Sequence, residues 1–315
     1  MMNRHTVSTP AWWGRLLMPL LGWGLMASAV TPAASQPLPQ VSVGRIERLA
    51  QVPSQHVDPR HVDVWIPAAC SAQQPCQVLY MHDGQMLFDA STTWNKQAWN
   101  VHLAVDKLMR EGLLAPTIVV GIWNNGAMRH SEYFPGKFLN HLAPATRQAL
   151  LDKTLQGRSR SDAYLRFIVE ELKPLIDQRF PVRPQAAHTA LMGASMGGLI
   201  SVYAMSEYPQ VFGGAAGLST HWVGIHEANA AIPLAAFNFL QQSLAPADGR
   251  RLYQDHGTTE LDALYGTYQR FVDQIVAGKG YTGRDYLSLV FEGTGHNEKA
   301  WAARLERPLR FIFGR

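Results

Sequence analysis

Short apolar runs alternate with longer amphipathic segments along most of this chain. Apolar runs bounded by turn residues are typical of buried strands, and a 3.6-residue apolar period is typical of helices. The pattern predicts strands at 62–66, 78–82, 118–123, 190–192, 214–218, 251–255 and 286–291. It predicts helices near 98–111, 162–179, 196–208, 261–277 and 299–311, with Pro174 kinking or splitting the second. This alternation predicts an α/β fold with a mostly parallel central sheet and helices on both faces.

Two long segments interrupt the alternation. Residues 124–160 are polar and rich in His, Arg and Asn, and residues 219–249 carry Trp222 and an Ala-rich helix with few charges. Both follow predicted strands, so both should lie over the carboxyl edge of the sheet, where ligands bind in such folds. We expect them to form the walls of a substrate pocket.

The amino-terminal residues have the pattern of a secretory signal peptide. Arg4 and Arg15 precede or flank a short apolar run at 16–26, and residues 27–29 form an A-x-A cleavage site. The apolar run is too short and too interrupted by Pro and Gly to span a bilayer comfortably. The sequence therefore predicts a signal peptide at 1–29, a linker at 30–45, a single catalytic domain at 46–315, and a periplasmic or secreted protein.

Charge and cysteine content narrow the range of partners. The formal net charge of +4 is small for 315 residues and includes no Lys/Arg block. This argues against nucleic acid as a partner, and against a membrane once the signal is cleaved. Cys70 and Cys76 are the only cysteines, and in an oxidising compartment we expect them to form a disulfide.

The most informative motif is Gly193-x-Ser195-x-Gly197, which matches the nucleophile elbow of serine hydrolases. In an elbow a strand turns sharply into a helix and holds the serine in a strained backbone conformation. Residues 188–192 read as the strand and residues 199–205 as the helix that follows. We therefore expect Ser195 to be a nucleophile.

A serine nucleophile needs a base and an acid, and in this fold they follow it in the order acid, then His. His296 lies in a glycine-flanked loop after the last predicted strand and is the expected base. Glu260 and Asp262 follow the preceding strand, and both remain candidates for the acid, with the spacing slightly favouring Glu260. His256 is a weaker candidate base because it precedes both acids.

An oxyanion hole needs two backbone N–H groups. One is expected from Met196, the residue after the nucleophile. The other should come from the loop after the 78–82 strand, at Gly84 or Gln85. His82 and Asp83, in the same loop, are expected to shape it rather than to react.

These motifs together resemble the putative esterase family of the α/β-hydrolase superfamily. The resemblance rests on residues 80–85, 118–122, 193–198 and 293–296, and it extends from about 62 to 313. The family includes esterase D types, siderophore esterases, feruloyl and acetyl-xylan esterases, and mycolyltransferases. The resemblance implies an α/β-hydrolase fold and a serine mechanism that needs no metal or other cofactor.

The expected function is therefore an exported serine esterase that hydrolyses a small-molecule or glycan ester through an acyl-enzyme. An acyltransferase with the same triad is one alternative, and a non-catalytic binding protein on a hydrolase scaffold is another. Trp123, Tyr133 and Trp222 belong either to the substrate pocket or to the core. Arg129, His130 and His141 either hold an anionic substrate or form a solvated face.

Overall fold

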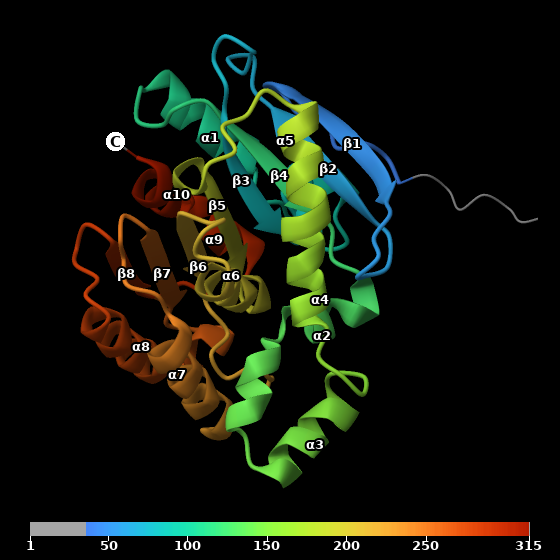
Figure 1. Cartoon of the computed structure of the whole chain (residues 1–315). Coiled ribbons are helices and arrows are strands. Elements are labelled where there is room, and N and C mark those ends of the chain that lie inside the picture. The colour runs from blue at the N-terminus through green and yellow to red at the C-terminus, as the bar shows by residue number, and fades with distance from the viewer. Residues whose placement is uncertain (1–35, 315) are drawn as a thin grey trace, which may run out of the picture. The chain divides into compact units, whose positions relative to one another are not determined.

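An eight-stranded sheet forms the centre of the structure, a computed structural model that describes residues 36–314 (Figure 1). The strand order is β1-β2-β4-β3-β5-β6-β7-β8. Strand β2 is antiparallel to both β1 and β4, and all other neighbours are parallel. The strands are β1 (Arg45–Val52), β2 (Arg60–Ile66), β3 (Gln77–His82), β4 (Thr117–Ile122), β5 (Thr189–Ala194), β6 (Gly214–Leu218), β7 (Arg251–Gly257) and β8 (Tyr286–Phe291).

Helices cover both faces of this sheet, as expected for an α/β-hydrolase fold (Figure 1). Two apolar clusters form the core, one on each face. The helices of one face are α1 (Val101–Arg110), α9 (Glu298–Arg304) and α10 (Glu306–Phe313). Those of the other are α4 (Ser161–Arg166), α5 (Lys173–Arg179), α6 (Met196–Glu207) and α8 (Gly266–Gly278). The predicted mostly parallel sheet with helices on both faces is confirmed.

Seven of the strands match the apolar runs in the sequence, and β1 was not predicted. Its apolar positions are few: only Leu49 and Val52 are buried, and charged residues occupy much of the rest. A strand at the edge of a sheet packs on one side only, so its hydrophobic pattern is weak.

The long helix predicted at 162–179 is helical throughout, but it changes from α to π geometry shortly before Pro174. A π-helical segment (Phe167–Leu172) lies between α4 and α5, and Pro174 occupies the first turn of α5. The missing amide of a proline inside a helix removes one backbone hydrogen bond. The wider π turn lets the chain continue in the same direction past it.

The domain takes in part of the predicted linker, 30–45. The first residues of that linker, like the predicted signal peptide 1–29, lie outside the described residues. The Gln40 amide donates to Asp89, and the carbonyl of Val43 accepts a 2.8 Å hydrogen bond from the Trp65 indole. Gln40 and Val43 therefore contact the domain just before β1, which begins at Arg45.

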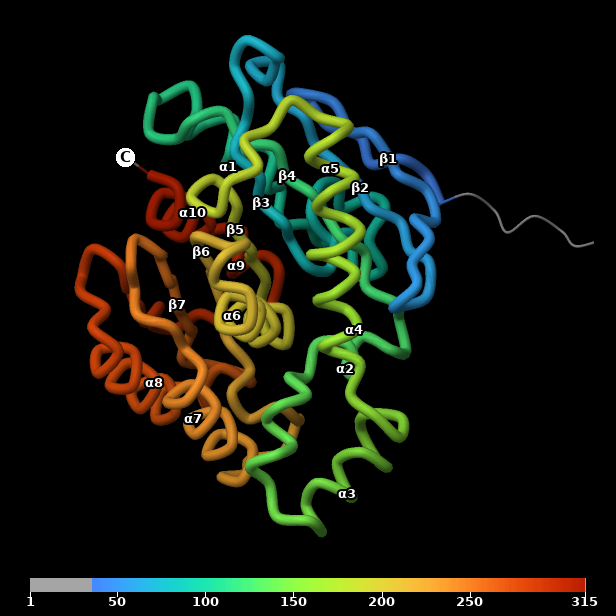
Figure 2. Tube along the Cα trace, in the orientation of Figure 1, coloured from blue at the N-terminus to red at the C-terminus, as the bar shows by residue number. Residues whose placement is uncertain are grey.

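The two long segments both contain helices, and they lie together below the sheet in Figure 2. Residues 124–160 form a 3₁₀ turn (Gly126–Met128), α2 (Arg129–Tyr133), a second 3₁₀ stretch (Gly136–His141) and α3 (Pro144–Lys153). The other segment contains α7 (Ala231–Ser243). Further 3₁₀ turns lie at Gly84–Met86, Ala90–Thr92, Ala186–His188 and Glu260–Leu264.

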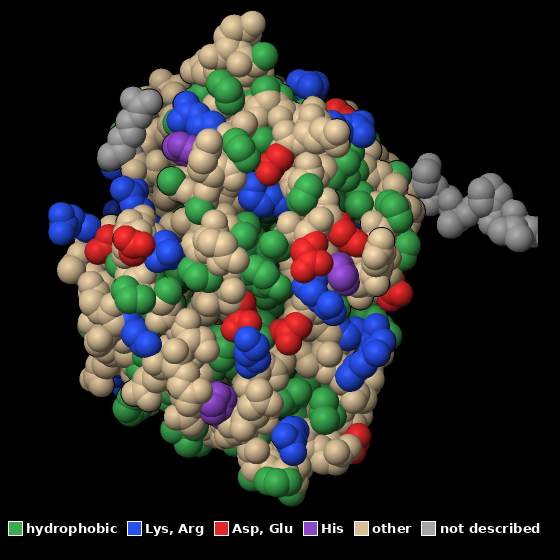
Figure 3. Space-filling view, in the orientation of Figure 1, with side chains coloured by type: hydrophobic (Ala, Val, Ile, Leu, Met, Phe, Trp, Pro, Cys, Tyr) green, Lys and Arg blue, Asp and Glu red, His purple; other side chains and the backbone are tan. Residues whose placement is uncertain are grey.

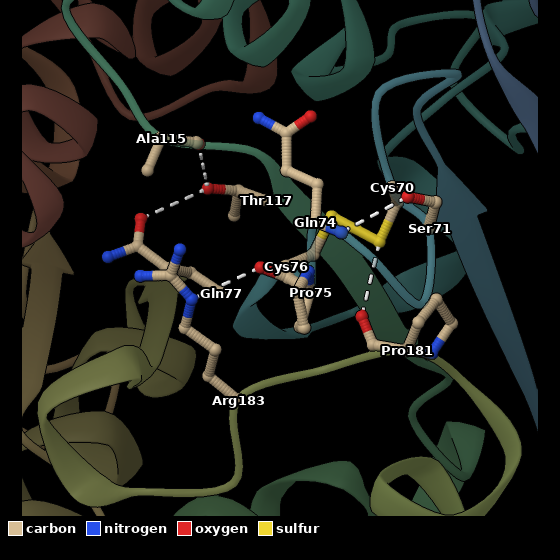
Figure 4. Close-up of a disulfide and its surroundings, with 10 residues drawn as sticks. All are labelled: Cys70, Ser71, Gln74, Pro75, Cys76, Gln77, Ala115, Thr117, Pro181 and Arg183. Atoms are coloured by element: carbon tan, nitrogen blue, oxygen red, sulfur yellow. Dashed lines mark hydrogen bonds between the residues drawn. A yellow bond between two sulfur atoms is a disulfide. The ribbon is translucent and has the colours of Figure 1, made fainter.

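The predicted disulfide joins Cys70 to Cys76 immediately before β3 (Figure 4). Backbone bonds of 2.9 and 2.8 Å tie Cys76 to Pro181 and Arg183, on the loop after α5. The bridge therefore fixes the amino end of β3, which is the opposite end from His82.

Within residues 36–314 no helix has the length and apolar character needed to cross a membrane. On the face shown in Figure 3, basic and acidic side chains are interspersed rather than gathered by sign.

Candidate active site

Ser195 lies between β5 and α6, at a sharp strand-to-helix turn. Its backbone has φ 58° and ψ −124°, a strained conformation for a residue with a side chain. The Ser195 amide donates to the carbonyl of Leu218 on β6, and its carbonyl accepts from His221. These bonds hold the turn in place at the carboxyl edge of the sheet.

The flanking glycines make this turn possible. A Cβ on Gly193 would lie 2.6 Å from the carbonyl carbon of Gly197, and one on Gly198 would lie 3.1 Å from the Cα of Gly217. The strand, the helix and β6 approach one another too closely for any side chain at Gly193. The first glycine of the G-x-S-x-G motif is therefore a packing requirement of this elbow.

His296 lies in the loop after β8 and contacts Asp262 directly. Its Nδ1 atom is 2.5 Å from Oδ1 of Asp262, a short, charge-assisted contact. Asp262 is fully buried, whereas the His296 side chain is 14% exposed. This geometry leaves the Nε2 atom of His296 as the ring nitrogen available to a reactant.

The second oxygen of Asp262 is held by two further donors. Oδ2 accepts hydrogen bonds of 2.6 Å from the Ser219 hydroxyl and from the Gly257 amide. Burial opposes ionisation of Asp262, but its hydrogen bonds with His296, Ser219 and Gly257 keep its pKa below the ordinary value. Asp262 is therefore an anion at neutral pH, with its orientation fixed.

Glu260, the other candidate acid, has a different position. Its Oε2 atom accepts a 2.7 Å hydrogen bond from the backbone amide of His296, not from its ring. Its own backbone is in the left-handed region, with φ 55°, and its carboxylate packs against Gly295. Glu260 holds the loop that carries His296, while Asp262 holds the ring.

Ser195 and His296 line the same cavity, which has a volume of about 350 Å³. Residues from both long segments contribute to its wall, as expected from the sequence. They include Asn124, Arg129, His130, His221 and His226. Three tryptophans, Trp94, Trp99 and Trp301, also line this cavity.

A buried tyrosine–histidine pair lies beside Ser195. The Tyr265 hydroxyl is 2.6 Å from Nδ1 of His221. Burial, together with the nearby His296, lowers the pKa of His221 to about 3, so this histidine is neutral. No Ser195–His296 hydrogen bond is present among the described residues.

Asp83 and Arg129 form a bidentate ion pair at the cavity wall. The guanidinium contacts the two carboxylate oxygens at 2.6 and 2.8 Å. Despite burial, Arg129 keeps the pKa of Asp83 below its usual value. His82 is buried against the Tyr164 hydroxyl, and burial lowers its pKa to about 4. Both side chains of this loop are therefore occupied by structural contacts, as the sequence suggested.

The predicted oxyanion amides lie at the start of a long helix and at the start of a short 3₁₀ turn. Met196 is the first residue of α6, and Gly84 and Gln85 begin the 3₁₀ turn after β3. Amides in a first turn have no intrahelical acceptor. Gly84 packs directly on Gly121 of β4, where a Cβ would lie 2.4 Å from the backbone, and the Gln85 side chain accepts from the Asn124 amide.

None of the aromatic residues singled out in the sequence lines the cavity: Tyr133 and Trp222 belong to the core, and Trp123 is half-buried. Trp222 is fully buried and donates to Gln269, Tyr133 is fully buried beneath Asp83, and the Trp123 indole donates to Asp63. The cavity tryptophans have no distinguishing local pattern, since their roles depend on which loops meet. His256 and His141 also lie outside the cavity lining.

Comparisons with known proteins identify the family and the fold. The family model described as "Putative esterase" matches residues 55–312. The uncharacterized protein YbbA of Bacillus subtilis is 26% identical over 183 residues, which are 58% of this chain and 71% of that protein.

Solved structures of esterases have the same fold. The enterobactin esterase of Shigella flexneri aligns with a TM-score of 0.62 and 16% identity, over 87% of this chain but only 60% of that one. A ferulic acid esterase of Anaeromyces mucronatus aligns with the same score and identity over 90% of this chain and 96% of that one. An IroE-like serine hydrolase of Shewanella oneidensis aligns with a TM-score of 0.62 over 85% and 79%.

Proposed function

The chain belongs to the putative esterase family, and we propose that it is an exported serine esterase whose catalytic triad is Ser195, His296 and Asp262. The observation that carries this proposal is the contact of His296 with buried Asp262, in a cavity that also contains the elbow serine. A base held in one tautomer by a buried acid is the arrangement that activates a serine hydroxyl.

In the first step the Ser195 hydroxyl turns toward Nε2 of His296 when an ester binds. His296 takes the proton as Oγ attacks the ester carbonyl, and Asp262 stabilises the imidazolium. His296 then gives this proton to the leaving alcohol, and an acyl-enzyme remains. Water, activated by His296, releases the acid and restores the serine.

The negative charge of the tetrahedral intermediate needs two amide donors. We assign the Met196 amide as one, and that of Gly84 or Gln85 as the other. Met196 lies in the cavity wall beside Ser195, at the positive end of α6. The contacts of Glu260 support a positioning role through the backbone of His296.

Export to the periplasm or the medium is supported by two features. The first is the signal-peptide pattern of residues 1–29, and the second is the Cys70–Cys76 disulfide, since disulfides persist in oxidising compartments. The mass of the mature amino terminus, measured after expression from the full chain, tests this directly.

Hydrolysis of p-nitrophenyl esters from acetate to laurate, by the mature protein and by Ser195→Ala, tests the activity. We expect turnover that disappears in Ser195→Ala. Activity that persists in this variant would contradict the serine mechanism. Acyl transfer to an added sugar alcohol that exceeds hydrolysis would instead favour the acyltransferase. If the protein is folded but hydrolyses none of these esters, the result would favour a non-catalytic binding protein.

A further inference from the structure

A second cavity, larger than the catalytic one, opens next to it. Its volume is about 580 Å³, and it lies between α3 and the segment that leads into α7. Its lining includes Thr146, Ala149, Leu150, Lys153, Ile225 and Ile232. His130 and His226 line both this cavity and the catalytic one, so the two spaces meet at these side chains.

The boundary between the cavities is well defined on one side. The Nε2 atom of His130 is 2.9 Å from the carbonyl oxygen of Gly224, which fixes the ring and requires a proton on that nitrogen. Burial lowers the pKa of His130, so the ring is neutral at pH 7. His226 is exposed, and it completes the boundary from the opposite segment.

The charges around the cavity indicate an uncharged ligand. Arg129, which lines the adjoining catalytic cavity, is paired with Asp83. Lys153 and Glu227 line the cavity with opposite signs. The floor is apolar, because Leu150 is only 6% exposed and Ile232 only 3%. An aliphatic chain would bury apolar surface there without leaving a charge unpaired.

The position of His296 indicates which part of the ester reaches this cavity. The leaving alcohol must lie within reach of Nε2 to receive its proton. The ring of His296 packs edge-on against that of Trp301 at 5.0 Å and that of Tyr265 at 5.9 Å. Our assignment puts the alcohol on the side of Trp301 and its neighbour Trp99. The acyl group then extends the other way, toward His130 and His226.

We propose that the cavity between α3 and α7 is the acyl subsite and holds the aliphatic chain of a medium-chain ester. This inference rests on the proposed function, because it locates the acyl group that Ser195 receives. It also identifies the substrate class: esters whose acyl chain is aliphatic, carries no charge and is longer than acetyl.

The test fills the cavity from both walls. Ala149→Trp changes an exposed residue of α3, and Ala231→Trp changes one at the start of α7; both line the cavity. Gln148→Trp is the matched control, since Gln148 is exposed on α3 but does not line it. We expect the ratio of kcat/KM for p-nitrophenyl octanoate to that for acetate to fall roughly tenfold in the filled variants. The ratio should be unchanged in the control.

Three results would overturn the proposal. One is an unchanged ratio in both filled variants. Another is an equal loss on acetate and octanoate, which would place the effect at the catalytic centre. The third is a selective loss on octyl acetate compared with ethyl acetate, which would assign the cavity to the alcohol.

Binding of octanoate separates this proposal from the esterase activity itself. Calorimetry with Ser195→Ala should detect octanoate binding that Ala149→Trp weakens and Gln148→Trp does not. This result would support the subsite even if no ester were hydrolysed. Failure of Ser195→Ala to bind octanoate would contradict the proposal even if acetate esters were good substrates.

Discussion

The Ser219 hydroxyl donates to Asp262 and to no other acceptor among the described residues. Its Oγ atom is 2.6 Å from Oδ2 of Asp262, and it accepts bonds of 2.9 Å from the Trp301 indole and from the Arg304 guanidinium. Because two donors already occupy the lone pairs of this oxygen, the hydroxyl proton points toward Asp262. Arg304 is in turn paired with buried Asp255, so a network beneath the sheet edge fixes the orientation of Asp262.

Removing this hydroxyl should slow catalysis without removing the triad. In Ser219→Ala, Oδ2 of Asp262 keeps only the Gly257 amide, and a hydrogen bond to a charged group is worth about 2 kcal/mol. We expect kcat to fall on the order of tenfold and the acidic limb of the pH–rate profile to move upward as Asp262 becomes a weaker acid. Ser219→Gly, which suits the left-handed φ of 46°, is the control for strain. Unequal kcat values in the two variants would mean that backbone strain, not the hydroxyl, is responsible.

Substitution of the two candidate acids, Asp262 and Glu260, should lower kcat by very different factors. Asp262→Asn places an amide against Nδ1 of His296 and favours the wrong tautomer, so kcat should drop by about 10⁴-fold. Glu260→Gln keeps an oxygen that can accept from the His296 amide, and we expect a loss of no more than about tenfold. Single-turnover rates on p-nitrophenyl acetate measure both. A larger loss in Glu260→Gln would reverse the two roles.

The Asp83–Arg129 pair should make stability depend on pH in the acid range. Because Arg129 lowers the pKa of Asp83, the pair stabilises the fold above the ordinary Asp value of about 4. That stability is lost as the pH falls through the lower pKa of the folded state. Arg129→Gln should therefore cost about 2 kcal/mol at pH 7, and the difference from wild type should shrink near pH 3.

Urea unfolding at the two pH values measures this difference. Arg110→Gln serves as control, since Arg110 is 70% exposed and pairs only with Asp106 on its own helix. Its effect should stay within about 0.5 kcal/mol at either pH. A constant difference between Arg129→Gln and wild type from pH 7 to pH 3 would show that the ionisation of Asp83 is not involved.

The disulfide should contribute to stability but not to activity. It closes a loop of a few residues, which is worth about 2 kcal/mol of unfolding free energy. It lies at the amino end of β3, away from the catalytic edge. The double variant Cys70→Ser/Cys76→Ser should have a lower Tm and an unchanged kcat/KM at 25 °C. Reduction of the wild type should reproduce the shift, and an altered kcat/KM would indicate coupling through β3.

The sequence identified the elbow because its glycines meet a local requirement: backbone atoms of Gly197 lie where a Cβ of Gly193 would be. It could not separate Glu260 from Asp262, because both lie in one 3₁₀ turn. What distinguishes them is burial of Asp262 against Ser219, a residue of another loop. The sequence did not reveal the cavity tryptophans either, because Trp94, Trp99 and Trp301 lie far apart along the chain and meet only in the folded structure.

The central claim is that Ser195 carries the acyl group. We would mix the mature protein with p-nitrophenyl acetate, quench with acid during the initial burst, and measure the mass of the intact protein and of its peptides. The account predicts one acetyl group, on the peptide that contains Ser195, and none in Ser195→Ala. An acetyl group on another residue, or turnover with no acylated protein, would contradict it.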